Sequence, residues 1–397
     1  MPIEVNPVIL AQSLAYFIAA YTIVTLSLNL EAGFTGIPNF GKHLFVAAGA
    51  FVVASIGNRL SAYIVSVLYK DEILKLIQED PLLSNRITEA DIGNLWSMYV
   101  DPLRNKDIDR IMDKFFAQNP ELGVLLFILI VLLAVAIGGL MGLLISYPAL
   151  RLRGEYLAIL LLAAAEMVVM AIGYYWKPLV GGTTGLLLPR YLAIFGQRVI
   201  LGITILLIIT AIAMYLYAQR IANSPAGRMM RAIRDDELAA ASLGKDIAKV
   251  RRDVIIISSA MSALAGALIA IHTGSVVSTH YQRLSWTFMP WAMMIIGGVA
   301  NNSGIVIGVS LIVILQMLVI IVLKPLLAPV LPFDPVWLYQ IGLGLIIILM
   351  LYMRPQGIIP EKPSRTLNFE EVFEDILEDK VEDEQAKKMI REGRATP

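Results

Sequence analysis

Long apolar runs that are almost free of charge recur along most of this chain and leave it few ways to fold. The run 199–218, for example, contains no charged side chain. A helix of about 20 apolar residues crosses the roughly 30 Å hydrocarbon core of a membrane, because its backbone amides all bond within the segment. With 57% hydrophobic and only 16% charged residues, the chain has too little polar surface for a soluble globule. The sequence therefore predicts an all-α, multi-spanning membrane protein.

The apolar runs predict about nine membrane passes. They cover residues 7–30, 40–57, 122–147, 156–174, 199–218, 254–273, 286–300, 305–323 and 337–353. The run 286–300 is the shortest of them, and a turn of Asn, Ser and Gly residues separates it from the next run. The expected fold is thus a bundle of transmembrane helices.

Basic residues beside the apolar runs predict the orientation. They gather in the loop 219–253, at Arg151 and Arg153 after the third run, and at Arg354 after the last. Cytoplasmic loops of membrane proteins are enriched in Lys and Arg. Nine passes therefore place the N-terminus outside and the C-terminus in the cytoplasm, as a multi-pass protein of the cytoplasmic membrane.

Composition divides the chain into four parts. Residues 1–57 hold two spans with a glycine-rich break, and residues 58–121 form an extracytoplasmic insertion in which acidic residues outnumber basic ones. The remaining spans and the basic loop lie in 122–360, and 361–397 form a charged cytoplasmic tail. Helical spacing of apolar residues predicts short helices in the insertion. Those residues are Ile73, Leu76, Ile77, Ile108, Ile111, Met112 and Phe115.

Composition also excludes several kinds of function. Without a cysteine the chain has no disulfide, thiolate nucleophile or Cys-type zinc site, and its three histidines are too scattered for a metal site. Equal numbers of basic and acidic residues, 32 of each, argue against a nucleic-acid-binding protein. The sequence has no Gly-x-x-x-x-Gly-Lys-Ser/Thr phosphate loop. We therefore expect no catalytic residue, metal or cofactor in this chain.

The loop 219–253 carries its own helix signals. Ser224 followed by Pro225 is typical of a helix start, and Gly244 is typical of a stop. The apolar side chains expected to share one face of this helix are Met230, Ile233 and Ala241. A loop with its own capped amphipathic helix is more than a topology anchor needs, although a plain basic surface helix is the alternative interpretation.

Polar groups within the apolar part predict a substrate pathway. Broken helices are tolerated in a membrane where they line a cavity, and a carboxylate in mid-span is costly unless it faces a cavity or a partner. The candidates form a break after the first run, a charge in the fourth run and an outward loop. They are Gly33, Thr35, Gly36 and Asn39, then Glu166, then Gly181, Gly182, Thr183 and Thr184. For the break, an ordinary turn is the alternative, and for Glu166 a structural bond to a neighbouring helix.

Residues 223–244 resemble the coupling loop of branched-chain amino-acid ABC transporter permeases of the LivH/LivM family, most closely the LivM type. Other blocks similar to the family lie in the same order along the chain, before and after this loop. They are at 33–36, 39–41, 151–159, 164–166, 181–186, 296–298 and 354–357. The resemblance departs at Lys42, which stands directly before His43 where the family usually has glycine or alanine. No role therefore passes to His43.

The resemblance implies an ABC importer permease fold and a subunit that moves Leu, Ile, Val or a related amino acid without chemistry of its own. The implied partners are ATP-binding ABC subunits that bind ATP and Mg, a second homologous permease subunit, an extracytoplasmic substrate-binding protein and the lipid bilayer, with no nucleic acid. The implied contacts with the ATPase are Ser224, Pro225, Gly227, Arg228, Arg231, Arg234, Glu237, Ala240 and Gly244.

Two alternatives to this function remain open from the residues. A permease of the same superfamily for urea, short amides or sugars would have the same fold and loop. A secondary transporter or channel that needs no ATPase would have no use for a capped cytoplasmic helix over 223–244. Uptake that persists without an ATPase subunit would favour the second alternative.

Overall fold

Long helices make up most of the structure, a computed structural model that describes residues 7–99, 101–152, 154–327, 332 and 334–361. The chain divides into two units, residues 1–360 and residues 361–397. The predicted tail therefore lies outside the described residues, apart from Glu361. The first unit is all-α, and within the described residues its only strands are a pair of two residues each.

Within the part of the chain that the structure describes, seven helices are long and apolar enough to cross a membrane. They cover Pro7–Phe34, Lys42–Leu68, Pro120–Ala149, Gly154–Tyr175, Ala193–Asn223, Ile247–Thr273 and Asn302–Leu327, and a shorter apolar helix covers Trp337–Met353. The predicted run 286–300 forms a π-helical turn and then α16, which at nine residues is about 14 Å long and shorter than the hydrocarbon core. The multi-spanning prediction is confirmed, whereas the count of nine is not.

The helices up to the third long span have the following bounds. They are α1 (Pro7–Leu28), α2 (Lys42–Val52), α3 (Asn58–Leu68), α4 (Lys70–Glu79), α5 (Pro81–Ser84), α6 (Glu89–Ile92), α7 (Leu95–Met98), α8 (Pro102–Gln118) and α9 (Pro120–Arg151). Single π-helical turns follow α1 at Asn29–Phe34 and α2 at Val53–Gly57. The second turn joins α2 to α3, so this helix continues through Leu68.

The remaining elements complete the bundle. They are α10 (Gly154–Met170), α11 (Lys177–Val180), β1 (Leu186–Leu187), α12 (Val199–Asn223), α13 (Pro225–Asp235), α14 (Glu237–Ser242), α15 (Ile247–Thr273), β2 (Ser275–Val276), α16 (Met289–Gly297), α17 (Asn302–Leu318), α18 (Lys324–Leu327) and α19 (Val336–Met353). Further π-helical turns lie at Ala171–Tyr175, Leu284–Phe288 and Val319–Leu323, and 3-10 turns at Gly182–Thr184, Ala193–Arg198 and Ser278–His280.

Helix α15 lies at the centre of the bundle and packs against α9, α2 and α1. Glycines allow its close approach to α2. A Cβ atom built on Gly266 would lie 1.9 Å from the carbonyl oxygen of Val46, and one on Gly49 would lie 1.9 Å from that of Ala263. Small residues at such crossings let helices associate in lipid, where no hydrophobic force drives helices together. This packing fixes α2 against α15.

Helices α4 and α8 confirm the helical periodicity predicted for the insertion. All seven apolar residues singled out from the sequence are buried. Near them, Asp80 Oδ2 forms ion pairs with Lys114 Nζ at 2.8 Å and with Arg110 Nε at 2.9 Å. These cations, with the Leu82 amide, hold the pKa of the Asp80 carboxyl below its usual value. The division of the chain into four parts stays a prediction.

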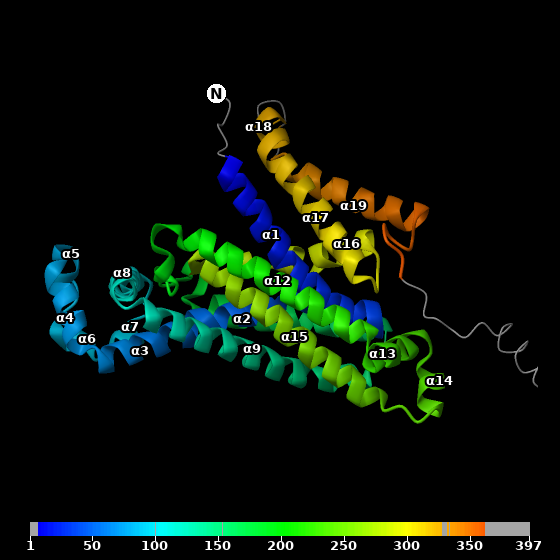
Figure 1. The fold of residues 1–397 in the computed structure, drawn as a ribbon, viewed down its shortest axis with the longest axis horizontal. Helices are drawn as coiled ribbons and strands as arrows, with labels where there is room; N and C mark the ends of the chain where they lie inside the picture. Colours follow the sequence, from blue (N-terminus) through cyan, green and yellow to red (C-terminus); the bar gives the residue numbers. More distant parts are fainter. Residues whose placement is uncertain (1–6, 100, 153, 328–331, 333, 362–397) are drawn as a thin grey trace, which may run out of the picture. The chain divides into compact units, whose positions relative to one another are not determined.

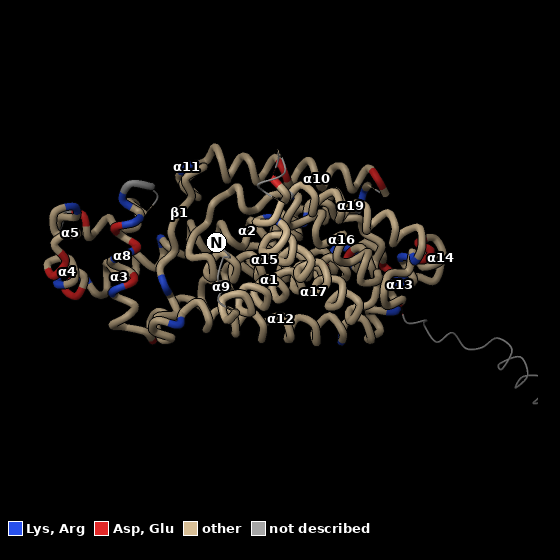
Figure 2. Tube along the Cα trace, turned by 90° about the horizontal axis from the view of Figure 1, so that it is seen from above, with Lys and Arg blue, Asp and Glu red and all other residues tan. Residues whose placement is uncertain are grey.

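The first unit carries its charged side chains mainly at two ends (Figure 2). Helices α13 and α14 lie at one end, which we call the loop end, and α4–α8 lie at the opposite end, which we call the insertion end (Figure 1). Between them the long helices are nearly free of Lys, Arg, Asp and Glu (Figure 2). The few charged side chains inside this middle part are therefore the ones that need an explanation.

Candidate functional site

The loop after α12 folds into two helices, so the prediction of one helix over 223–244 is wrong in its middle. Ser224 caps α13 as predicted, and its Oγ accepts from the Gly227 amide at 3.3 Å. Asp236 then leaves the helix, at φ −153° and ψ 107°, and its carboxylate accepts from the Leu238 and Ala239 amides to cap α14. An aspartate that bonds nearby amides in this way competes with helix continuation.

The break at Asp236 also shifts the buried face of the loop. Met230 and Ile233 are buried as predicted, but Ala240 takes the place expected for Ala241, which is exposed. Gly244 lies in the left-handed region at φ +73°, where the second helix ends. The loop thus presents a two-helix surface rather than a single rod.

Two arginines of α13 fasten the loop to the end of the first span. Arg234 Nη1 donates to the Gly33 carbonyl at 2.8 Å, and the Arg231 guanidinium lies 5.0 Å from the centre of the Phe34 ring. A Cβ atom on Gly36, which has φ +72°, would lie 3.1 Å from Arg234 Cγ. The predicted coupling loop and the predicted glycine-rich break therefore contact each other directly.

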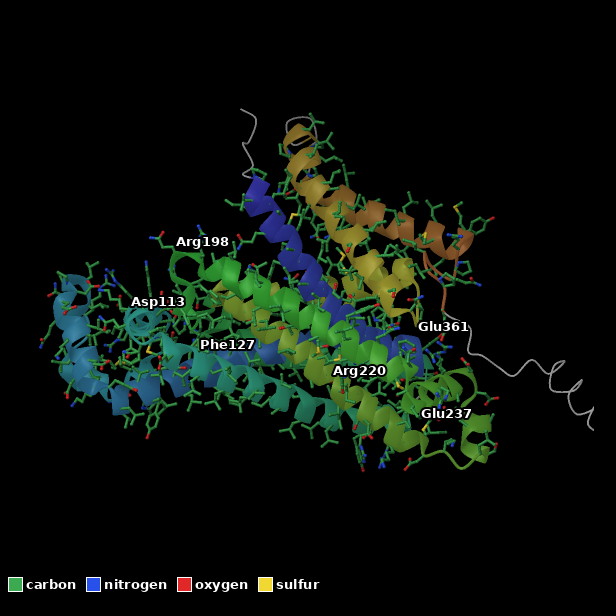
Figure 3. All side chains as sticks on the ribbon, viewed as in Figure 1. Asp113, Phe127, Arg198, Arg220, Glu237 and Glu361 are labelled. Carbon is green, nitrogen blue, oxygen red and sulfur yellow. The ribbon has the colours of Figure 1, made fainter. Side chains whose placement is uncertain are left out.

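The other coupling candidates divide between internal and exposed positions. Glu237, at the loop end in Figure 3, pairs with Arg251 at 3.1 Å. Gly227 is buried, and a Cβ atom there would lie 2.3 Å from the Ala222 carbonyl oxygen. Pro225 and Arg228 are exposed. Surface contacts with a partner could therefore use Pro225 and Arg228, whereas Arg231, Arg234 and Glu237 contact this chain itself.

The break after α1 contains a sealed ion pair, which we call the inner pair. Lys42 Nζ lies 3.0 Å from Glu31 Oε2, and both side chains are 0% exposed. Asn39 also donates to Glu31 at 3.0 Å, and Lys42 donates to Ser258 of α15 at 2.8 Å. The Ser258 hydroxyl in turn donates to Glu31. With these bonds each charge has several partners, as a buried pair requires.

The remaining candidates in the break also bond within the protein. Thr35 is buried, and its hydroxyl donates to the Leu30 carbonyl at 2.9 Å. Asn39 Oδ1 accepts from the Gly41 amide at 2.9 Å. Gly33 packs against Asn29 and Ala300. Together with the bonds of the inner pair to Ser258, these contacts make the break a joint between α1, α2 and α15.

A second polar cluster, which we call the outer cluster, forms around Glu166 of α10. Glu166 Oε2 lies 3.4 Å from His43 Nε2, and Oε1 lies 3.8 Å from Arg283 Nη1. The His43 amide donates to the Thr287 hydroxyl at 3.0 Å, and His43 Nδ1 lies 3.1 Å from the same oxygen. Segments at three distant places in the sequence therefore converge on one carboxylate.

A cavity of about 450 Å³ opens beside this carboxylate, and we call it the Glu166 cavity. Its polar lining is Glu166, Tyr174, Ser278, Tyr281, Gln282 and Arg283, and its apolar lining is Val169, Met170, Leu284 and Phe288. Small-molecule sites commonly have volumes of about 300–1,000 Å³, with mostly apolar walls and a few polar groups that orient the ligand. The cavity has a volume in this range, and apolar side chains stand beside its polar groups.

Irregular backbone forms one wall of the cavity. Between β2 and α16 the chain makes a 3-10 turn at Ser278–His280 and a π-helical turn at Leu284–Phe288. Ser278 donates to the Gly173 carbonyl at 2.7 Å, which places this stretch beside the π-helical turn that ends the fourth span. Non-helical backbone at membrane depth is tolerated where it lines a cavity.

The predicted outward loop lies next to this wall. Gly181 and Gly182 have φ of +75° and +65°, and Thr184 donates to the Gly181 carbonyl at 2.7 Å. Thr183 is exposed. Directly after this loop β1 pairs antiparallel with β2. The loop therefore borders the cavity wall through the strand pair, while the lining side chains come from α10, the π-helical turn that follows it and 278–288.

A larger groove, of about 550 Å³, lies between α1, α12 and α17. Its lining is almost wholly apolar, with Thr22, Tyr215 and Ser303 as the polar exceptions. A surface of this kind offers few groups that could orient a polar solute. The smaller Glu166 cavity is therefore the better candidate for a substrate site.

Sequence reasoning identified Glu166 but missed the residues that surround it. His43 received no role, and Arg283 and Gln282 lie in the short stretch before the run 286–300. The inner pair was missed as well, although Glu31 and Lys42 are two of the few charges near the first two runs. The rule that charged residues within a membrane are functional or paired could have identified both.

Comparison with known proteins gives a consistent result. The family model described as "Branched-chain amino acid transport system / permease component" matches residues 10–351. The "Probable branched-chain amino acid transport permease protein LivM" of Methanocaldococcus jannaschii is 35% identical over 350 residues, 87% of this chain and 92% of that protein. The "High-affinity branched-chain amino acid transport system permease protein LivM" is 27% identical in Escherichia coli, over 56% of each chain. Its Salmonella typhimurium counterpart is 26% identical, over 55% of this chain and 54% of that one. No solved structure matches the chain.

Proposed function

The chain belongs to the family of branched-chain amino acid transport permeases, and on that premise we propose that it carries Leu, Ile, Val or a related amino acid inward. It is a permease subunit of an ABC importer and a multi-pass membrane protein, and it is a transport subunit rather than an enzyme. The observation that carries the mechanism is a continuous set of contacts between α13 and the Glu166 cavity.

These contacts join the loop end to the cavity in a few steps. In order, the residues are Arg234, Gly33, Glu31, Lys42, His43 and Glu166. Gly33 and Glu31 share one π-helical turn, and Lys42 and His43 are neighbours at the start of α2. Coupling between distant sites travels through packed elements that have two arrangements. A shift of α13 would therefore move the start of α2 and, with it, the imidazole behind the cavity.

Partner subunits supply the energy in this proposal. Two ATPase subunits bind ATP and Mg, and one of them contacts the exposed side of α13 and α14. A second homologous permease completes the pathway, and an extracytoplasmic binding protein delivers the amino acid. The loop end then faces the cytoplasm, and the N-terminus and the insertion 58–121 face outside. The basic residues of the loop 219–253 support this orientation.

The orientation can be tested directly because the sequence contains no cysteine. Ala226 and Ser84 are both exposed, one at the loop end and the other in the insertion. In intact cells, a membrane-impermeant maleimide should label Ser84→Cys and should label Ala226→Cys only after the cells are opened. The reverse pattern would contradict the proposal.

The activity itself is tested in proteoliposomes that contain this chain, its second permease, the ATPase subunits and the binding protein. Radiolabelled leucine should accumulate only when ATP is present on the ATPase side. Accumulation of urea or a sugar in place of leucine would support the alternative substrates. Leucine uptake without the ATPase subunits would support a secondary transporter.

A further inference from the structure

The Glu166 cavity holds one negative and one positive side chain within reach of each other. Glu166 and Arg283 approach to 3.8 Å, and their side chains are 35% and 54% exposed. Both therefore remain accessible, in contrast to the inner pair. A separation of 3.8 Å is also too long for a hydrogen bond, so the pair is loosely held.

A buried histidine stands directly behind Glu166. His43 is 0% exposed, and within the described part of the chain its Nε2 has no hydrogen-bond partner. The Thr287 hydroxyl accepts from the His43 amide, so the simplest pairing has this hydroxyl donate to Nδ1. The ring then carries its proton on Nε2, which lies 3.4 Å from the carboxylate. This proton favours a charged Glu166.

Glu166 lies near the middle of the fourth span, Gly154–Tyr175. Glu166 comes 12 residues after the start of α10 at Gly154, a rise of about 18 Å along the helix. In such surroundings an uncompensated charge is expensive. A neutral ligand that separates Glu166 from Arg283 leaves both charges without a partner. A ligand with an ammonium and a carboxylate on one carbon gives each of them a new partner of opposite charge.

We propose that the Glu166 cavity binds a zwitterionic α-amino acid, with the ammonium group at Glu166 and the carboxylate at Arg283. The apolar side chain of the ligand then packs against Val169, Met170 and Phe288. His43 is a positioning residue that holds the Glu166 carboxylate. This inference rests on the proposed function and deepens it, because it selects amino acids over urea, amides and sugars at a site within the permease itself.

Binding to the transporter without its external binding protein tests this site. The assembled permease and ATPase complex is purified in detergent, and radiolabelled L-leucine is displaced by three probes. L-leucinamide keeps only the ammonium group, 4-methylpentanoate keeps only the carboxylate, and urea keeps neither. For the natural chain we expect leucine to bind at least about tenfold more tightly than each of these probes. Equal displacement by urea and leucine, or no binding of leucine, would overturn the proposal.

Two variants assign the charges to the ends of the ligand. Glu166→Gln should weaken leucine and leucinamide at least about tenfold and leave 4-methylpentanoate unchanged. Arg283→Gln should weaken leucine and 4-methylpentanoate and leave leucinamide unchanged. Matched controls are Glu155→Gln and Arg198→Gln, which alter exposed residues outside the cavity lining. Arg283→Lys, which keeps the charge, should retain much of the leucine binding.

A purely structural role for the pair gives a different pattern. Both variants would then lose all ligands to the same extent, and that result would overturn the proposal. The outcome is separable from the proposed function. If proteoliposomes take up leucine while the variants show no charge-matched pattern, the importer stands and this site does not. If they take up urea instead of leucine, the proposed function fails.

Discussion

Two opposite-charge pairs lie beside consecutive residues of α2, and their surroundings differ. The inner pair, Glu31 and Lys42, is 0% exposed on both sides and is bonded further to Asn39 and Ser258. In the outer cluster, Glu166 and Arg283 are only partly buried and line a cavity. A sealed and fully bonded pair has no room for a ligand, so its role is structural. An accessible and loosely held pair can exchange its partner for a charged group of a ligand, so its role is to bind solutes.

The two sites are also mechanically joined. Lys42 belongs to the inner pair and His43 to the outer cluster, and both lie in the first turn of α2. The inner pair in turn lies in the same joint as Gly33, the carbonyl of which accepts from Arg234. The inner pair can therefore transmit a displacement from the loop end, while the outer cluster responds to it.

Breaking the inner pair should have the largest effect. Lys42→Met leaves a buried carboxylate without its cation, and removal of one partner of a buried pair typically costs about 3–5 kcal/mol. We expect a clearly lower thermal unfolding midpoint in detergent, with little folded protein recovered. Lys70→Met, at an exposed lysine of α4, is the matched control.

The double variant Glu31→Leu/Lys42→Met checks the reason for that loss. Because it removes both charges, it should recover much of the stability lost in Lys42→Met. If the double variant is as unstable as the single one, poor packing of the substituted side chains explains the loss of stability, and the unpaired charge does not. If Lys42→Met is as stable as the natural chain, the pair has no structural role.

The outer cluster should show the opposite balance of effects. Glu166→Gln keeps the size of the side chain and removes a charge that is about one-third exposed, so the unfolding midpoint should change little. Leucine uptake in proteoliposomes should fall at least about tenfold, since one charged contact with the ligand is lost. Membrane insertion should be intact. Normal uptake by the variant would remove the distinction between the two pairs.

Much of this comparison could not be read from the sequence. The apolar runs predicted the long helices, Ser224 and Gly244 predicted where the loop helices begin and end, and Glu166 was identified as a charge in mid-span. All of these are local signals. The outer cluster needs residues 43, 166 and 283 in one place, and only the packing of α2, α10 and the stretch before α16 brings them together.

The error in the loop and the unconfirmed span count have similar physical causes. At Asp236, a side chain that caps the next helix outweighed the apolar pattern that favours one helix. In 286–300, apolar composition predicted a full span, but the chain forms a π-helical turn and a short helix instead. Composition alone does not distinguish a full span from a short helix beside irregular backbone.

The link between loop and inner pair should give a smaller effect than either pair. Arg234→Ala removes the hydrogen bond to the Gly33 carbonyl. Residues along a coupling path typically change coupling by about 0.5–2 kcal/mol, so leucine imported per ATP hydrolysed should fall about fivefold. Basal ATP hydrolysis should persist. Arg252→Ala, at a partly exposed arginine of α15 that pairs with Asp253, is the control. An unchanged ratio in Arg234→Ala would show that α13 acts through other contacts.

A third set of charges, in the insertion, extends the comparison to acids that lie close together outside the spans. The Asp109 carboxylate accepts a hydrogen bond from the Tyr99 hydroxyl at 3.3 Å, and the Asp113 carboxylate accepts one from the Arg190 backbone amide at 2.6 Å. Burial first, and then the charge of Asp113, raise the pKa of Asp109 to about 7, although Tyr99 and Arg190 act to lower it. Burial raises the pKa of Asp113 as well, against the opposing effect of Arg190.

The raised pKa of Asp109 makes the stability of the insertion depend on pH with a definite sign. The native state binds the proton more tightly than the unfolded state, so stability is highest at low pH and falls as the pH rises toward about 7. Amide protection in α8, corrected for intrinsic exchange, should therefore be lower at pH 8 than at pH 6. Asp109→Asn should reduce this difference and raise protection at pH 8, whereas Asp71→Asn, at an exposed acid of α4, should not. Protection in α8 that does not change with pH would show that these two acids are not held close together. The contrast between buried and accessible charges would then apply only to the pairs within the spans.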